Sequence, residues 1–215
     1  MDESIEPAAA PLPLRQALKM ETRSRLEKAA TDLIARQGYR DTTIEQIVQA
    51  AGTTRTTFYQ HFRGKADFIG TLQSREIAPA LMALCRKLDA LEPLSRDGLR
   101  AWCNEYARTW KRIHVFFEAY YDAARTDAAV AATMLPNSYE VTASMSRWLG
   151  SLEEPARTRF HDQLVVMFTN LDAIVTQVAA CGQQPAKSTL LDAFVDIFWD
   201  GMFAPLVQPG DGPAA

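Results

Sequence analysis

A short stretch near position 55 concentrates side chains that can bind nucleic acid. Arg55, Thr56 and Tyr59 lie at i, i+1 and i+4 of a predicted short helix, whereas Phe58 and Phe62 point to a different side. An arginine can form two hydrogen bonds with a guanine, and a threonine methyl group can contact the methyl group of thymine. The polar side of this helix therefore has chemistry suited to base edges.

Two short helices would be needed to position these side chains. The first is predicted from Thr43, with Gln46 at capping-box spacing, and it ends at Ala51. The second is predicted to begin at Thr54, another N-cap residue. Gly52 lies between the two helices and can take the positive φ that such a tight turn requires. The pattern is that of a helix-turn-helix, in which the first helix covers the apolar side of the second.

The flanking residues extend this candidate surface. A helix is predicted over residues 20–37 and ends at Gly38, and another runs from Lys65 into the eighties. His61 and Lys65 are placed to contact the phosphate backbone, as is the Thr43 hydroxyl. Any one of these side chains alone would more often be an ordinary surface or structural residue, so the interpretation depends on the combination.

Charge is distributed unevenly along the chain. The net charge is −3 over 215 residues, which argues against general binding of nucleic acid. Residues 15–65, however, contain ten basic and five acidic residues, whereas residues 66–215 contain 13 basic and 18 acidic residues. A basic module on an acidic body is expected if only one end of the chain contacts phosphate.

The run from Thr42 to Phe68, TTIEQIVQAAGTTRTTFYQHFRGKADF, resembles the DNA-binding domain of the TetR family of transcriptional regulators. The resemblance covers about residues 20–68. It rests on Gly38-Tyr39 and Ala51-Gly52, on the aromatic run from Phe58 to Phe62, and on Lys65. It implies a homodimer whose two recognition helices enter successive major grooves of a palindromic operator. The predicted DNA contacts are Thr43, Thr54, Arg55, Thr56, Thr57, Tyr59, His61 and Lys65.

The body of the chain has two clusters of aromatic residues. One lies on a helix predicted from Ser95 to about Arg112, and the other follows His114. These side chains could line a cavity for a small apolar or aromatic effector. The alternative is that they simply form the core. The candidate effector-binding residues are Trp102, Tyr106, Trp110, Phe117, Tyr120, Tyr121, Phe168 and Asp172.

The last two predicted helices are apolar over unusually wide arcs. One follows Pro155 and reaches about Ala180, and the other spans about residues 188–204. A partner chain would explain this width, because two helices from each subunit can form a four-helix interface. Deep burial within one chain is the alternative. The candidate interface residues are Phe160, Leu164, Leu171, Val175, Val178, Leu191, Phe194, Val195, Phe198, Trp199 and Met202.

Two further local features are predicted in the body. Pro136 is expected to break or kink a helix between about Ala128 and Leu149. The sequence from Ser151 to Glu154 has capping-box spacing before the following helix.

Several classes of protein are disfavoured. The sequence has no GxSxG, HExxH, Gly-rich phosphate loop or ExxH pair, so we expect neither an enzyme nor a cofactor or metal site. Cys85, Cys103 and Cys181 are far apart, which argues against disulfides and favours a reducing cytoplasm. The N-terminus lacks the order of a secretory signal, and no membrane segment is expected.

The sequence thus predicts an all-α protein with three parts. They are a flexible tail over residues 1–19, a three-helix DNA-binding domain with a helix-turn-helix over 20–68, and a larger helical effector-binding and dimerisation domain over 69–215. Arg15 and Lys19 in the tail could instead extend the phosphate contacts as an arm. The predicted function is a ligand-responsive transcriptional regulator, a repressor that a small effector releases from double-stranded DNA. The alternative is a protein-interaction module, or an enzyme, with an incidental helix-turn-helix.

Overall fold

The computed structural model describes residues 14–207, and this part of the chain is all-helical, as predicted. The chain divides into two compact units, with the boundary between Phe68 and Ile69. Residues 1–13 of the predicted tail lie outside the described residues. Residues 14–19, also assigned to the tail, are instead the start of a helix that begins at Leu14. The reason is local, because this stretch has no glycine or proline and is rich in good helix formers.

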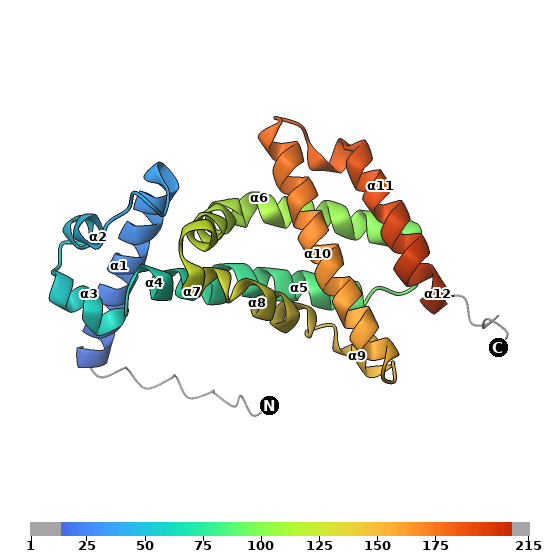
Figure 1. The fold of residues 1–215 in the computed structure, drawn as a ribbon, viewed down its shortest axis with the longest axis horizontal. Helices are drawn as coiled ribbons and strands as arrows, with labels where there is room; N and C mark the ends of the chain where they lie inside the picture. The colour runs from blue at the N-terminus through green and yellow to red at the C-terminus, as the bar shows by residue number, and fades with distance from the viewer. Residues whose placement is uncertain (1–13, 208–215) are drawn as a thin grey trace, which may run out of the picture. The chain divides into compact units, whose positions relative to one another are not determined.

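Three helices and the start of a fourth build the first unit (Figure 1). They are α1 (Leu14–Gln37), α2 (Ile44–Ala50), α3 (Arg55–His61) and α4 (Lys65–Leu72). Their apolar faces share a core, which buries Leu26, Ala30, Ile34, Ile47, Phe58, Phe62 and Phe68. Burial of these side chains supplies most of the stabilisation of such short helices, which are marginal in isolation.

The ends of α2 and α3 are fixed by the predicted caps. Thr43 Oγ1 accepts a hydrogen bond from the Gln46 amide at 3.2 Å, and the Thr43 amide donates to Gln46 Oε1 at 2.8 Å. The predicted capping box is therefore confirmed. Thr54 Oγ1 accepts from the Thr57 amide at 3.2 Å and caps α3 in the same way. Each such cap contributes about 1 kcal/mol to helix stability.

Two glycines make the turns of this unit possible. Gly38 has φ +83° after α1, and Gly52 has φ +63° between α2 and α3. A Cβ atom added at Gly52 would meet no atom within 4 Å. A substitution there would therefore be unfavourable because of the positive φ, and not because of steric crowding. The predicted positive φ at the helix-turn-helix is confirmed.

The second unit is a bundle of helices. A π-helical turn (Gln73–Ile77) continues α4 into α5, and the helices are α5 (Ala78–Asp89), α6 (Arg96–Thr126), α7 (Ala128–Ala131), α8 (Met134–Thr142), α9 (Ser146–Gly150), α10 (Ala156–Ala180), α11 (Thr189–Phe198) and α12 (Ala204–Val207). A 3₁₀ turn (Pro185–Lys187) precedes α11, and a π-helical turn (Trp199–Phe203) joins α11 to α12. Helix α10 packs against α6, α8 and α11, and Figure 1 shows α10 and α11 as neighbours.

Three local predictions about this unit need correction. Both aromatic clusters lie on one long helix, α6, which continues past Arg112 to Thr126. Pro136 does not break a helix but lies in the first turn of α8, where its missing N–H is tolerated. Ser151 does not cap α10: the N-cap position is Pro155, without a side-chain cap, and Glu154 accepts hydrogen bonds from Thr158 instead.

Helix α10 is long and apolar enough, by length and composition, to cross a membrane. Most of its large apolar side chains are nevertheless buried against neighbouring helices of the same chain, Leu164 and Leu171 completely. This is the pattern of a core helix of a bundle.

Candidate DNA interface and ligand cavity

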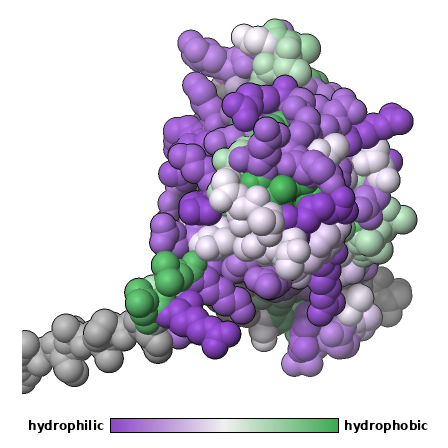
Figure 2. All heavy atoms as spheres, turned by 90° about the vertical axis from the view of Figure 1, so that its left-hand side faces the viewer, coloured by the Kyte–Doolittle hydropathy of each residue, from purple (hydrophilic) through white to green (hydrophobic). Residues whose placement is uncertain are grey.

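Helix α3 separates a buried face from an exposed polar face. Phe58 and Phe62 are fully buried in the core of the first unit. Arg55, Thr56 and Tyr59 are exposed, and the Tyr59 side chain retains 48% of its accessible surface. The face that the sequence predicted to contact bases is therefore accessible. Seen from the side on which α1, α2 and α3 lie, the surface is mostly hydrophilic (Figure 2).

Arg55 belongs to a small cluster that also contains Glu45 and Tyr59. Its guanidinium forms an ion pair with Glu45 at the start of α2 and donates a hydrogen bond to the Tyr59 hydroxyl at 3.4 Å. The same group lies 5.8 Å from the centroid of the Tyr59 ring. The Tyr59 hydrogen bond and the Glu45 charge raise the pKa of Arg55 further, so the side chain is permanently cationic. Together these contacts hold the arginine in a defined position at the surface.

Glu45 was missed at the level of sequence. It lies in the first turn of α2, as Arg55 lies in the first turn of α3, so the turn between the helices brings the two together. The sequence did show an acidic residue, Glu45, two positions after the predicted N-cap Thr43. Its pairing with Arg55 became visible only once the packing of α2 on α3 was known.

The remaining candidate contacts of the first unit divide into exposed and structural residues. Thr43 and Thr54 are exposed, but both hydroxyls also cap helices. The Thr57 hydroxyl is hydrogen-bonded to that of Thr54 at 3.0 Å. His61 is half-buried at the end of α3, and burial together with Lys19 and Arg23 lowers its pKa. It is therefore mainly neutral at pH 7.

Lys65 has a structural role in addition to its predicted one. Its ammonium donates hydrogen bonds to the carbonyl oxygens of Tyr39 and Thr42, both at 2.7 Å, and approaches that of Arg40 at 3.5 Å. It also lies 4.3 Å from the centroid of the Tyr39 ring. These contacts tie the start of α4 to the loop between α1 and α2, and they direct the positive charge into that loop.

Replacing Lys65 by methionine should therefore destabilise the first unit. Each hydrogen bond from a charged group contributes roughly 1.5–3 kcal/mol, so we expect a loss of about 2 kcal/mol in the free energy of unfolding. Chemical denaturation followed by circular dichroism would measure it. Lys28→Met, on the exposed face of α1, is a matched control and should stay within about 0.5 kcal/mol of the wild type. Equal stability of the two variants would contradict the structural role.

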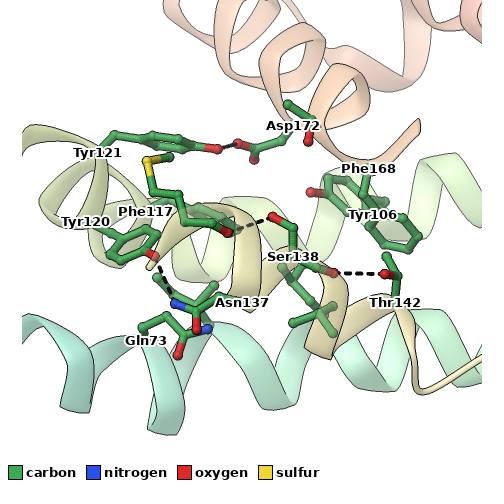
Figure 3. A pocket seen from close by; sticks show the side chains of 15 residues that line it. Gln73, Tyr106, Phe117, Tyr120, Tyr121, Asn137, Ser138, Thr142, Phe168 and Asp172 are labelled. Carbon is green, nitrogen blue, oxygen red and sulfur yellow. Dashed lines mark hydrogen bonds between the residues drawn. The ribbon is translucent and has the colours of Figure 1, made fainter. Parts of the chain in front are cut away.

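The second unit contains a cavity between α5, α6, α8 and α10 (Figure 3). Six of the eight candidate effector residues line it, namely Tyr106, Phe117, Tyr120, Tyr121, Phe168 and Asp172. The contribution of α8 was not predicted from the sequence, which indicated only a helix broken or kinked at Pro136 between about Ala128 and Leu149. Asn137, Ser138 and Thr142 come from that element.

Two candidate effector residues do not line this cavity. Trp102 is a core residue whose Nε1 donates to the Leu84 carbonyl at 2.9 Å and whose ring packs edge-on against Phe168. Trp110 instead lines a second, larger pocket formed by α6, the end of α10 and the residues that follow it, together with Lys111 and His114. Both prolong the same i, i+4 series as Tyr106, so sequence spacing alone could not separate cavity residues from core residues.

The cavity is small in this structure. Its volume is about 70 Å³, which is room for roughly two water molecules. Pockets that hold drug-sized ligands have about 300–1,000 Å³. A ligand larger than a few atoms must therefore displace side chains or part the helices around the cavity.

Asp172 is the ionisable acid of this cavity. Its side chain is 5% exposed, and Oδ2 accepts a hydrogen bond from the Tyr121 hydroxyl at 2.6 Å. Burial raises the pKa of Asp172, and the Tyr121 hydrogen bond partly offsets that effect. Burial and the neighbouring Asp172 also raise the pKa of Tyr121, so this phenol stays protonated as the donor.

Substitution of Asp172 by asparagine should remove a pH dependence of stability. Because the folded-state pKa is raised, the folded state holds the proton at pH values where the unfolded chain has released it. The free energy of unfolding therefore falls as pH rises from the ordinary aspartate pKa through the folded-state value. We expect the difference between Asp172→Asn and wild type to grow in favour of the variant over this range and then level off. Denaturation midpoints measured from pH 4 to 8 test this, and a constant difference would contradict it.

The predicted dimer-interface residues are mostly buried inside the single chain. Nine of the eleven are core residues, because α10 and α11 pack against each other and against α6: Phe160, Leu164, Leu171, Val175, Val178, Leu191, Phe194, Val195 and Met202. These nine side chains are therefore already buried within the single chain. Phe198 and Trp199 are half-exposed and remain available.

The accessible face of α10 and α11 is nevertheless uncharged along most of its length. On α11, Leu190, Ala193 and Ile197 are exposed at helical spacing, and Ile197 retains 67% of its accessible surface. On α10, Val166 and Ala173 are exposed, and no charged residue is exposed between Val166 and Ala180. We call these five residues the α10–α11 surface. Asp192 and Asp196 of α11, and Asp200 of the turn that follows, instead form ion pairs with Arg96 and Arg100 of α6.

The thiols and the possible metal ligands show no constellation for chemistry. Burial raises the pKa of Cys85 and of Cys103 to about 12, so both remain unreactive thiols. Cys181 is exposed. Among residues 14–207, no group of three or more histidine, cysteine or acidic side chains could hold a metal ion.

Comparison with known proteins bears on this arrangement. The model of the family "Bacterial regulatory proteins, tetR family" matches residues 26–72, which include the whole helix-turn-helix. This match assigns residues 26–72 to the DNA-binding domain of the tetR family. Over 57 residues it is 42% identical to the transcriptional regulator SrpR of Pseudomonas putida, and the match spans 26% of this chain and 27% of SrpR.

Two other transcriptional regulators match over most of the chain. The regulator TcmR of Streptomyces glaucescens is 26% identical over 218 residues, covering 92% of this chain and 91% of TcmR. The crystal structure of FadR from Thermus thermophilus, a repressor in complex with lauroyl-CoA, superposes with a TM-score of 0.58 at 21% identity and covers 90% of this chain and 98% of that one. The likeness to FadR supports the tetR fold of the second unit, where sequence similarity is low.

Proposed function

We propose that this tetR-family regulator is a repressor that binds a palindromic operator as a homodimer and is released by a small-molecule effector. The observation that carries the proposal is the exposed polar face of α3, where Glu45 and Tyr59 hold Arg55 at the surface. It lies on the basic part of a chain that is otherwise acidic. A short helix with these side chains fits the major groove.

The proposed contacts divide into base edges and phosphates. Arg55 and Thr56 would contact bases, with Tyr59 beside them. Thr43 and His61 lie at the margins of α2 and α3 and would contact phosphate oxygens, which fix the register of the protein without reading sequence. Lys65 is not needed as a direct contact, because its ammonium is engaged by carbonyl oxygens.

A homodimer is proposed through the α10–α11 surface. Fully buried parts of protein interfaces are depleted of charged residues, as this surface is. A two-fold axis would place Val166, Ala173, Leu190, Ala193 and Ile197 of one subunit against the same residues of its partner. The half-buried Phe198 and Trp199 would lie at the margin.

Effector release is proposed through the cavity of the second unit. The structure of Thermus thermophilus FadR contains lauroyl-CoA, so another protein of this fold binds a small molecule. In our proposal, a ligand expands the small cavity between α5, α6, α8 and α10 and favours a dimer whose two α3 helices no longer match the half-sites. This function requires no catalytic group and places the protein in the cytoplasm with its DNA.

Selection from a randomised DNA duplex library tests the proposal. We expect enrichment of a two-fold symmetric sequence by the purified protein. Its affinity should fall steeply between 50 and 200 mM salt, because each neutralised phosphate contributes about −0.9 to the slope of log K against log salt. A protein-interaction module or an enzyme with an incidental helix-turn-helix would enrich no sequence and would show no such slope.

A further inference from the structure

One polar atom in the cavity of the second unit has no hydrogen-bond partner. Asp172 Oδ1 is buried, and no donor of the described residues forms a hydrogen bond with it. Its twin Oδ2 is satisfied by Tyr121. In Figure 3 the Asp172 carboxylate lies at the edge of the cavity, with the Tyr121 hydroxyl directed at it and Tyr106 across from it.

Three other polar side chains that line this cavity already have partners. Ser138 donates to the Met134 carbonyl at 3.0 Å, and Thr142 donates to the Ser138 carbonyl at 2.8 Å. Asn137 donates to the Tyr120 hydroxyl at 2.9 Å. These groups are engaged within the protein, so the free acceptor of Asp172 stands out among them.

The lining also lacks a positive charge. Its fifteen residues include Asp172 but no lysine, arginine or histidine. Five of the lining residues are aromatic, and the rings of Phe117 and Tyr121 lie nearly parallel, 6.0 Å apart between centroids. Aromatic rings attract cations through their negative faces. A carboxylate without a cation in such surroundings is costly to bury unless something else compensates it.

We propose that the effector is an organic cation with an N–H group, which donates to Asp172 Oδ1 while its apolar part packs among Tyr106, Phe117 and Tyr121. This inference rests on the proposed effector-responsive function and names the class of ligand for the same cavity. An amine supplies both the missing hydrogen-bond donor and the missing positive charge, whereas an alcohol supplies only the donor and a carboxylate supplies neither.

A donor within the protein, Trp110 Nε1, is the alternative to a ligand as the hydrogen-bond partner of Asp172 Oδ1. This Nε1 is also buried without a partner, and both Trp110 and Tyr106 stand close enough to the Asp172 carboxylate to lower its pKa. A small shift of the indole could turn that approach into a hydrogen bond with Oδ1. The two explanations can be distinguished by experiment. Only if a cationic ligand is the partner of Asp172 should binding depend on the charge of the added compound.

The test uses matched sets of small aromatic compounds and the full-length protein without DNA. Benzylamine, 2-phenylethylamine and 2-naphthylmethylamine are each compared by calorimetry with the corresponding alcohol and carboxylate. We expect at least one amine to bind at least tenfold more tightly than its alcohol and its carboxylate. Asp172→Asn should weaken that amine at least tenfold and leave the alcohol within threefold.

Two control variants separate charge at the cavity from other effects. Glu140→Gln removes the same charge from the exposed face of α8 and should leave amine binding unchanged. Trp110→Phe should also leave the preference for amines unchanged. Equal binding of amines and alcohols, insensitivity to Asp172→Asn, or no amine binding at millimolar concentration would each overturn the inference. Failure of the proposed function would instead appear as an absence of sequence-specific DNA binding, which this calorimetric test does not involve.

Discussion

Replacing Ile197 by glutamate is expected to dissociate the dimer and to weaken operator binding by at least about 100-fold. Ile197 is the most exposed large hydrophobic residue of the α10–α11 surface, and the proposed dimer buries it against the partner. Two like charges buried in an apolar interface cost several kcal/mol, and each 1.4 kcal/mol is a factor of ten in affinity. Light scattering coupled to size-exclusion chromatography would report the change of mass.

A matched control keeps this prediction specific. Leu135→Glu introduces the same charge at an exposed leucine of α8, outside the α10–α11 surface, and should leave the mass and the operator affinity unchanged. Circular dichroism should show both variants to be folded, because both side chains are largely exposed in the single chain. A dimer that persists in Ile197→Glu would place the interface elsewhere.

Replacing Arg55 by alanine is the second prediction with a large expected effect. Each bidentate contact between an arginine and a guanine contributes about 1–3 kcal/mol of discrimination, and the dimer has two copies. We therefore expect operator affinity to fall at least about 30-fold while affinity for unrelated duplexes changes much less. Fluorescence anisotropy with the selected duplex and with a scrambled one would measure both.

Glu45 allows a sharper test of the same site. Because Glu45 pairs with Arg55, Glu45→Gln should remove a negative charge next to the DNA and leave the arginine less fixed. Affinity for scrambled DNA should then rise and the ratio of specific to non-specific affinity should fall. Arg112→Ala removes a positive charge from the exposed face of α6, as Arg55→Ala does from α3, so it is the control for Arg55→Ala and should change neither the operator affinity nor the affinity for scrambled DNA. A loss of operator affinity in Arg112→Ala equal to that in Arg55→Ala would indicate a mere effect of net charge.

The helix-turn-helix could be predicted from sequence because its signals are local. The N-caps at Thr43 and Thr54 and the glycine at position 52 each act within a few residues, and the structure has all three where predicted. The start of α1 was missed because Leu14 and the residues after it follow a stretch rich in proline and alanine. Residues 14–19 are good helix formers, but no N-cap residue in the sequence marks the point where the helix begins.

The body was harder to predict because burial there depends on tertiary packing. Phe194 and Val195 belong to a wide apolar arc that a partner could cover, but α6 and α10 of the same chain cover it instead. Ile197 lies within the same apolar arc but is exposed, and the neighbouring residues in the sequence do not indicate that it differs in burial from Phe194 and Val195. Six of the eight candidate effector residues line one cavity, because the aromatic residues of α6 among them recur at helical spacing and face inward.

The central claim is that two copies of this chain read one symmetric DNA site, and the stoichiometry of the complex tests it most directly. The duplex selected from the randomised library would be mixed with wild-type protein, and the mass of the complex and the footprint on each strand would be measured. We expect two chains on one duplex, or a multiple of two, with half-site centres one helical turn of about 34–36 Å apart or a multiple of it. A single chain protecting an asymmetric site would contradict the account.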